Sequence, residues 1–123
     1  MKNSKRVLIV EDDTWLSDNY IRFLKKSGFI TKSVENASLA IDAIDDFKPD
    51  VIILDVLLSD GNALPLLHEI NSYTDISSTP IVLCSNLASE LVLEDLSFYG
   101  VKKIIDKTAM KPSDIVVAAK GLI

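Results

Sequence analysis

Short stretches of consecutive apolar residues recur along the chain and predict strands. The clearest lie at residues 7–10, 51–54 and 81–83, and weaker ones rich in β-branched residues lie at 29–34 and 101–105. Runs that are continuous rather than alternating indicate strands buried on both faces, as in a parallel sheet. Their starts lie about 20 to 30 residues apart, which leaves room for one helix between successive strands.

The segments between these runs carry apolar residues at helical spacing. Gly28, Pro49 and Gly100 are natural ends for three of the segments, and Pro65 is acceptable only in the first turn of another. The five predicted helices contain, in chain order, the apolar stripe 16–24, the stripe 39–47, residues 61–71, residues 88–99 and the stripe 115–123. Alternating strands and helices of this kind predict an α/β fold of five βα units.

Length, composition and charge bound the function. The 123 residues match one ordinary domain, which we expect to span 1–123. A net charge of −5 disfavours binding to nucleic acid or to an anionic membrane, and no apolar run approaches the roughly 18 residues of a membrane span. The single cysteine, Cys84, excludes an internal disulfide and a zinc cluster. The first residues do not resemble a signal peptide, so we expect a reduced, cytoplasmic protein.

Carboxylates follow two of the predicted strands. Glu11, Asp12 and Asp13 come directly after the first strand, and Asp55 comes directly after the third. In a parallel sheet the ligand site lies beyond the carboxyl ends of the strands, so we expect these acids to meet at one edge. Clustered carboxylates repel each other unless a cation is present, and oxygen ligands without His or Cys suit a hard cation such as Mg²⁺.

Two further polar residues are expected at the same edge. The fourth strand leads to Ser85 and the fifth leads to Lys107. A hydroxyl and an ammonium group supply the donor and the positive charge that a phosphoryl oxygen needs. Together with the acids they predict a Mg²⁺-dependent site that handles phosphoryl groups. Asp55, alone at the end of the central buried run, is its predicted nucleophile.

Each of these residues alone also has an ordinary structural interpretation. Asp13 can cap the first helix, Ser85 can cap the fourth, and Lys107 can be a solvated surface lysine. The convergence of four strand ends, rather than any single residue, favours a functional site.

Four motifs make the chain resemble a receiver domain of the two-component response regulators, a family that includes chemotaxis regulators. They are VLIVEDD (7–13), PDVIILDVLLSDG (49–61), PIVLCSN (80–86) and IIDKT (104–108), and they occur in the family's order and spacing. The resemblance they support extends over essentially all 123 residues. The resemblance implies the flavodoxin-like fold. This is a doubly wound, five-stranded parallel sheet of strand order 2-1-3-4-5, flanked by five helices.

The resemblance also implies roles for individual residues. Asp55 matches the aspartate that accepts a phosphoryl group from a histidine kinase or a phosphotransfer protein. Ser85 matches the switch hydroxyl that moves towards this group, and Lys107 matches the lysine that pairs with it. Glu11 and Asp106 match variable positions, and we interpret them as structural.

Mg²⁺ is the cofactor that the resemblance implies. Asp13 and Asp55 match direct ligands of the ion, and Asp12 matches the acid that holds it through water. The backbone carbonyl of Leu57 matches the remaining protein ligand.

By resemblance, the expected function is a phosphorylation-activated signalling switch, not a metabolic enzyme, although the domain assists its own phosphorylation and dephosphorylation. The loop after the fourth strand shifts, and the change reaches the surface of the fourth helix, fifth strand and fifth helix. That surface is expected to bind an output partner or a fused effector domain, and a homodimer is a further option. No direct binding to nucleic acid or membrane is expected of this domain.

Several positions depart from the family's pattern. Ile104 stands where an aromatic residue is usual and Asn86 where a small residue is usual, while Ser59 and Thr108 each replace a usual proline. Two positions that tune the lifetime of the phosphoryl group are apolar, Leu57 and Leu87. Apolar side chains cannot orient an attacking water, so we predict slow self-dephosphorylation.

Two other functions fit parts of the sequence. Ile104 and Asn86 leave open a receiver-like interaction module that works without phosphorylation. The Asp nucleophile and Mg²⁺ also fit a phosphohydrolase, but Leu57 stands where such enzymes carry a second acid.

Overall fold

Five parallel strands form one sheet in the computed structural model, which describes residues 4–58, 61–73, 78–86, 91 and 93–123. They are β1 (Arg6–Val10), β2 (Ile30–Val34), β3 (Val51–Asp55), β6 (Ile81–Ser85) and β7 (Val101–Asp106). Their spatial order is β2-β1-β3-β6-β7, and every neighbouring pair is parallel. Counted along the chain within this sheet, the order is 2-1-3-4-5, which confirms the predicted fold class.

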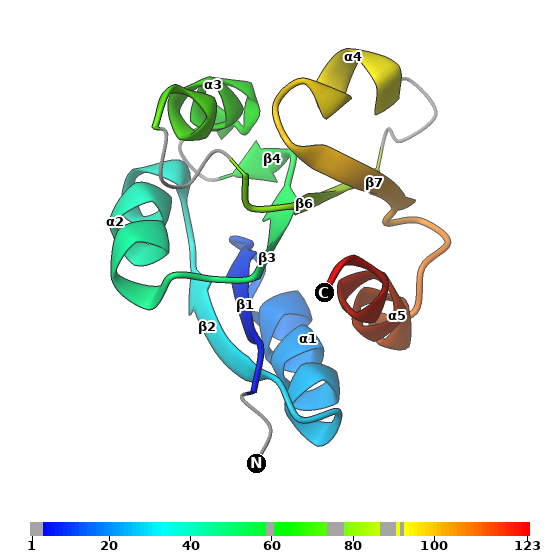
Figure 1. Ribbon diagram of the computed structural model, residues 1–123. Helices are drawn as coiled ribbons and strands as arrows, with labels where there is room; N and C mark the ends of the chain where they lie inside the picture. The colour runs from blue at the N-terminus through cyan, green and yellow to red at the C-terminus, as the bar shows by residue number, and fades with distance from the viewer. Residues whose placement is uncertain (1–3, 59–60, 74–77, 87–90, 92) are drawn as a thin grey trace.

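Helices cover both faces of the sheet (Figure 1). α1 (Thr14–Lys26) and α5 (Pro112–Leu122) lie side by side on one face. α2 (Ala37–Phe47), α3 (Leu64–Ser72) and α4 (Leu93–Ser97) lie on the other. The predicted count of five helices is confirmed for the described residues. No helix in these ranges is both long enough and apolar enough to span a bilayer.

The central strands are buried on both faces, which explains their continuous apolar runs. Successive residues of a strand point to opposite faces. In β3, Ile52 and Leu54 therefore join the core under α2, α3 and α4, while Val51 and Ile53 join the core under α1 and α5. Every residue of β3 and β6 is buried, whereas β2 at the sheet edge is mostly exposed or half-buried.

The third helix starts later than its predicted range of 61–71, because a short hairpin precedes it. β4 (Leu57–Leu58) pairs with β5 (Gly61–Asn62) in an antiparallel arrangement. The Ala63 N–H then donates to the Val56 carbonyl oxygen at 2.7 Å, which closes the hairpin. Pro65 lies in the first turn of α3, the one place where the sequence allows it.

The fourth helix, predicted over 88–99, is described only in part. Its described portion is Leu93–Ser97, and residues 98–100 form a turn. Residues 88–90 and 92 lie outside the described residues, as do Ser59 and Leu87.

Three strands run slightly past their apolar stretches. β3 ends at Asp55, β6 at Ser85 and β7 at Asp106, so each strand's last residue is polar. The strands are parallel and in register at this end, with Asp55 opposite Cys84 and Ser85 opposite Asp106. The fold thus places the polar residues that end these three strands at one edge of the sheet.

Candidate functional site

Three carboxylates meet at the carboxyl edge of the sheet. One oxygen from each of Glu11, Asp12 and Asp55 lies within 4.8 Å of the others. Glu11 and Asp55 are buried, with 3% and 7% of their surface exposed, and Asp12 is exposed. The group therefore opens to solvent on the side of Asp12.

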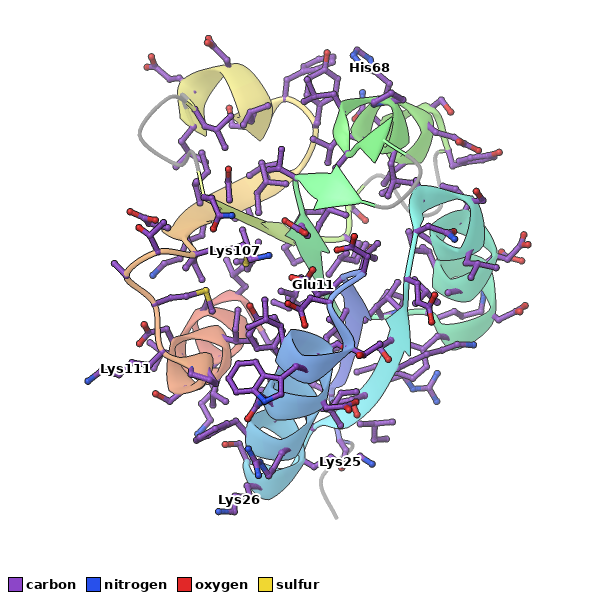
Figure 2. All side chains as sticks on the ribbon, turned by 180° about the vertical axis from the view of Figure 1, so that it is seen from behind. Glu11, Lys25, Lys26, His68, Lys107 and Lys111 are labelled. Carbon is purple, nitrogen blue, oxygen red and sulfur yellow. The ribbon has the colours of Figure 1, made fainter. Side chains whose placement is uncertain are left out.

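Lys107 reaches into this acidic group from the loop after β7. Its Nζ lies 2.8 Å from Glu11 Oε1 and 3.4 Å from Asp55 Oδ2. Figure 2 shows Glu11 and Lys107 approaching the same edge of the sheet from different strands. The Lys107 N–H also donates to the Ser85 carbonyl oxygen at 2.9 Å, which ties the start of this loop to the end of β6.

The electrostatics of the group favour an additional cation. Burial raises the pKa of Glu11 to about 7, an effect that Asp55 reinforces and Lys107 opposes. Burial alone would lower the pKa of Lys107, but the hydrogen bond to Glu11 and the negative charges of Asp55 and Glu11 outweigh it and raise that pKa. Glu11 and Asp55 thus share one ammonium group, and Asp12 adds a third carboxylate beside them, so a further positive charge is favourable here.

The donor set fits Mg²⁺. All three side chains offer carboxylate oxygens, the ligands that this hard cation prefers. Mg²⁺ keeps several of its waters, so a group that is partly exposed on the side of Asp12 suits it better than a closed cage.

Asp13, which the resemblance implies as a direct ligand of Mg²⁺, is placed differently from the other acids. Its Oδ1 accepts a hydrogen bond from the Leu16 N–H at 3.2 Å, so Asp13 is the N-cap of α1. This is the structural interpretation that the sequence left open for it. The structure does not bring the Asp13 carboxylate into the group formed by Glu11, Asp12 and Asp55.

Glu11, which the sequence interpretation treats as structural, belongs to the acidic group. Its N–H donates to the Val34 carbonyl oxygen of β2 at 3.1 Å and so continues the sheet by one residue. Its side chain accepts from the Asp13 N–H at 3.2 Å through Oε2 and binds Lys107 through Oε1. The available signal was its place directly after a buried apolar run.

Ser85 and Leu57 are both neighbours of the acidic group. Ser85 is a neighbour in the sheet, and Leu57 is a neighbour along the chain. Ser85 is the last residue of β6 and is 4% exposed, so it belongs to a strand and not to the start of a helix. The backbone of Leu57 is part of β4, two residues after Asp55. Its side chain is not among those described.

Comparison with known proteins gives a consistent result. The family described as the response regulator receiver domain matches residues 7–120. The transcriptional regulatory protein BaeR of Escherichia coli is 29% identical over 90 residues, which cover 73% of this chain and 36% of BaeR. The chemotaxis protein CheY of Thermotoga maritima is 25% identical over 115 residues, covering 93% of each.

The fold has the same relatives. The crystal structure of the chemotaxis response regulator CheY4 of Vibrio cholerae superposes with a TM-score of 0.84 at 17% identity, covering 98% of this chain and 100% of that one. The chain spans about a third of the length of BaeR but nearly all of the chemotaxis proteins. With a family match over almost its whole length, the chain belongs to the response regulator receiver domains.

Proposed function

We propose that the chain is a phosphorylation-activated switch in which Asp55 accepts a phosphoryl group from a histidine kinase or a phosphotransfer protein. The observation that carries the proposal is the placement of Lys107, whose Nζ lies 3.4 Å from the buried Asp55 carboxylate. We further propose that residues 1–123 act as one domain and that the protein works in the cytoplasm.

The transfer exchanges one bond to phosphorus for another. An oxygen of Asp55 bonds to phosphorus as the bond to the donor's imidazole nitrogen breaks, and the imidazole leaves with its electron pair. Charge spreads over the three equatorial oxygens in the loose transition state. Lys107 supplies a positive charge for one of these oxygens, and the Ser85 hydroxyl is the donor proposed for another.

The residues proposed to hold Mg²⁺ are Asp12 and Asp55, with Glu11 beside them and the Leu57 carbonyl as the backbone ligand. When bound, the ion supplies the remaining neutralisation of the phosphoryl oxygens. The resemblance implies Asp13 as a direct ligand and Asp12 as an indirect one; we propose Asp12 as the direct ligand instead, because its carboxylate lies beside those of Glu11 and Asp55.

The switch follows from the added negative charge. An acyl phosphate on Asp55 offers Lys107 and Ser85 a stronger partner than the carboxylate alone. The phosphoryl group shifts the population only by its different affinity for the two states of the domain. We propose that the surface of α4, β7 and α5 carries the output, to a separate partner, to a fused effector domain or to a second copy.

Intact mass after incubation with Mg²⁺ and acetyl phosphate tests the proposed chemistry. A single phosphoryl adduct is expected that requires Mg²⁺ and is absent in Asp55→Ala. Asp45→Asn, which changes an exposed acid of α2, is the matched control and should leave the adduct intact. A wild-type chain that binds Mg²⁺ but forms no adduct, from acetyl phosphate or from a kinase, would favour the interaction module that works without phosphorylation.

Two neighbouring substitutions decide between the alternative metal ligands. Asp12→Asn should lower the affinity for Mg²⁺, measured by titration calorimetry, by tenfold or more. Asp13→Asn should leave this affinity nearly unchanged, since asparagine also serves as an N-cap. The reverse result would return the direct-ligand role to Asp13.

Slow dephosphorylation stays a prediction from the sequence, because Leu87 and the side chain of Leu57 lie outside the described residues. The double variant Leu57→Asn, Leu87→Glu should lose its phosphoryl group faster than the wild type. A wild-type half-life of seconds, or a double variant that is no faster, contradicts the prediction.

A further inference from the structure

Two hollows border the loop that follows β7, and Met110 forms a wall between them because it lines both. The first, here called the site pocket, has a volume of about 330 Å³ and is lined by residues that include Asp13, Tyr20, Asn86 and Lys107. The second, the β7–α5 groove, has about 310 Å³ and is lined by Lys103–Asp106 of β7, by Ala109, and by Asp114 and Val117 of α5. Met110 lines both the site pocket and the β7–α5 groove.

Met110 is connected to the acidic site through a short segment that is hydrogen-bonded within itself. The N–H groups of Ala109 and Met110 both donate to the Asp106 carbonyl oxygen, at 3.2 and 3.1 Å. The Asp106 carboxylate accepts from the backbone and the hydroxyl of Thr108. Hydrogen bonds thus connect residues 106–110 to one another. This segment contains Lys107, whose ammonium group is held by Glu11 and Asp55.

The side chain of Met110 is in turn held from the helix layer. The Tyr20 hydroxyl of α1 contacts Met110 Sδ at 3.9 Å. Tyr20 is 1% exposed, and within the described ranges no buried polar side-chain atom lacks a partner. Burial, reinforced by the neighbouring acidic groups, raises the pKa of Tyr20, so its hydroxyl stays a proton donor. A thioether is an adaptable partner that can follow such a donor through small movements.

We propose that the contact between Tyr20 and Met110 couples the acidic site to the β7–α5 groove, with Met110 acting as the positioning residue between them. The inference rests on the proposed phosphorylation of Asp55. A phosphoryl group that draws Lys107 towards it pulls on residues 106–110 as a unit. Because Tyr20 is fixed in the core, Met110 must turn against it, and the wall shared by the two hollows moves. The groove then has a different shape in the phosphorylated domain.

A fluorescent probe in the groove tests this coupling. Val117 is 65% exposed and lines the groove, whereas Cys84 is buried, so Val117→Cys provides a selectively reactive thiol for an environment-sensitive dye. In the otherwise wild-type chain, acetyl phosphate with Mg²⁺ should change the dye's emission in step with the adduct seen by intact mass.

Three substitutions in this labelled background then separate the contact from the chemistry. Tyr20→Phe and Met110→Leu each remove the O–H···S contact while keeping the packing, and each should reduce the emission change about two- to fivefold. The double variant should lose no more than either single one, because both delete the same contact. Tyr99→Phe, whose hydroxyl bonds to His68 away from the site, should leave the response unchanged.

The outcomes distinguish the inference from the function on which it rests. An adduct that forms normally in Tyr20→Phe and Met110→Leu, with a reduced emission change, supports the coupling. An adduct with a full emission change in both variants, or with no change in the wild type, overturns the coupling and leaves the switch chemistry standing. Absence of an adduct in the wild type overturns the proposed function itself.

Discussion

Asp13 shows, at the scale of a single residue, how one carboxylate can be assigned to two functions. Replacing it removes a negative charge near the acidic site and, in the alanine variant, also removes the cap of α1. Asp13→Asn removes the charge alone. We expect Asp13→Ala to be less stable than Asp13→Asn by about 1 kcal/mol in urea unfolding, the usual worth of an N-cap. Equal stabilities of the two variants would show that the cap contributes nothing.

Cys84 permits a second prediction at this scale. Burial raises the pKa of its thiol to about 12, an effect that Lys107 opposes and Asp55 and Glu11 reinforce. The thiolate fraction in the folded protein is therefore lower than in the unfolded chain by a factor on the order of a thousand. A thiol reagent near neutral pH should label the unfolded protein readily and the folded protein only through unfolding.

The raised pKa of Cys84 also determines how its contribution to protein stability changes with pH. Because the folded state holds its proton more tightly, the contribution of Cys84 to stability is complete below the unfolded thiol pKa and is lost as the pH rises towards the folded one. Cys84→Ala should lack this part of the alkaline loss of stability in urea unfolding. An unchanged pH profile in the variant would assign the loss to other groups.

At the scale of elements, β3 is buried on both faces, whereas an amphipathic strand is buried on one face only. Ile52 and Ile53 are consecutive, yet each is buried in a different core. Ile52→Ala and Ile53→Ala should therefore each cost about 2–5 kcal/mol of unfolding free energy. The same substitution at Ile30 of the edge strand β2, which is 45% exposed, should cost about 1 kcal/mol or less. A large loss at only one of the two β3 positions would contradict two-sided burial.

The elements that could be predicted are those whose signal is local. Continuous apolar runs reveal β1, β3 and β6 because both faces of these strands are buried. The start of α3 was predicted too early because backbone pairing of Gly61 and Asn62 with β4 leaves no trace in an apolar pattern.

The site was predictable to the same extent. Asp55, Ser85 and Lys107 each follow an apolar run, so their edge of the sheet follows from the sequence. The three consecutive residues after β1, however, all carry a carboxylate, so the residue type does not tell them apart. Glu11 extends the sheet through one more hydrogen bond, to Val34 of the neighbouring strand, and the sequence does not encode that contact locally.

At the scale of the whole molecule, we expect the acidic site to lower the stability of the fold. The chain carries a net charge of −5, and it clusters three carboxylates, two of which share the Lys107 ammonium group. Asp12→Asn should therefore stabilise the protein in the presence of a chelator, because it relieves repulsion in this group. Asp45→Asn, on the surface of α2, should have a smaller effect.

Mg²⁺ should reverse the order of stability of the wild type and Asp12→Asn. A ligand that binds only the folded state adds about 1.4 kcal/mol at ten times its Kd, and the wild type should gain this amount. Asp12→Asn should gain much less, so thermal unfolding with and without Mg²⁺ checks both halves of the prediction. A variant destabilised without metal, or one that gains as much from Mg²⁺ as the wild type, would contradict it.

The strand order also bears on how the chain emerges from a ribosome. β1 lies between β2 and β3, so three strands can pair as soon as β3 has been synthesised. β6 then joins β3 and β7 joins β6, so each later strand is added to the same growing edge and none must be threaded between two already paired. The apolar face of α1, with Tyr20 and Leu24, gains its helical neighbour only when α5 has emerged. Until then part of that face lacks its helical cover, and transiently exposed apolar surface of this kind makes a nascent chain prone to aggregation.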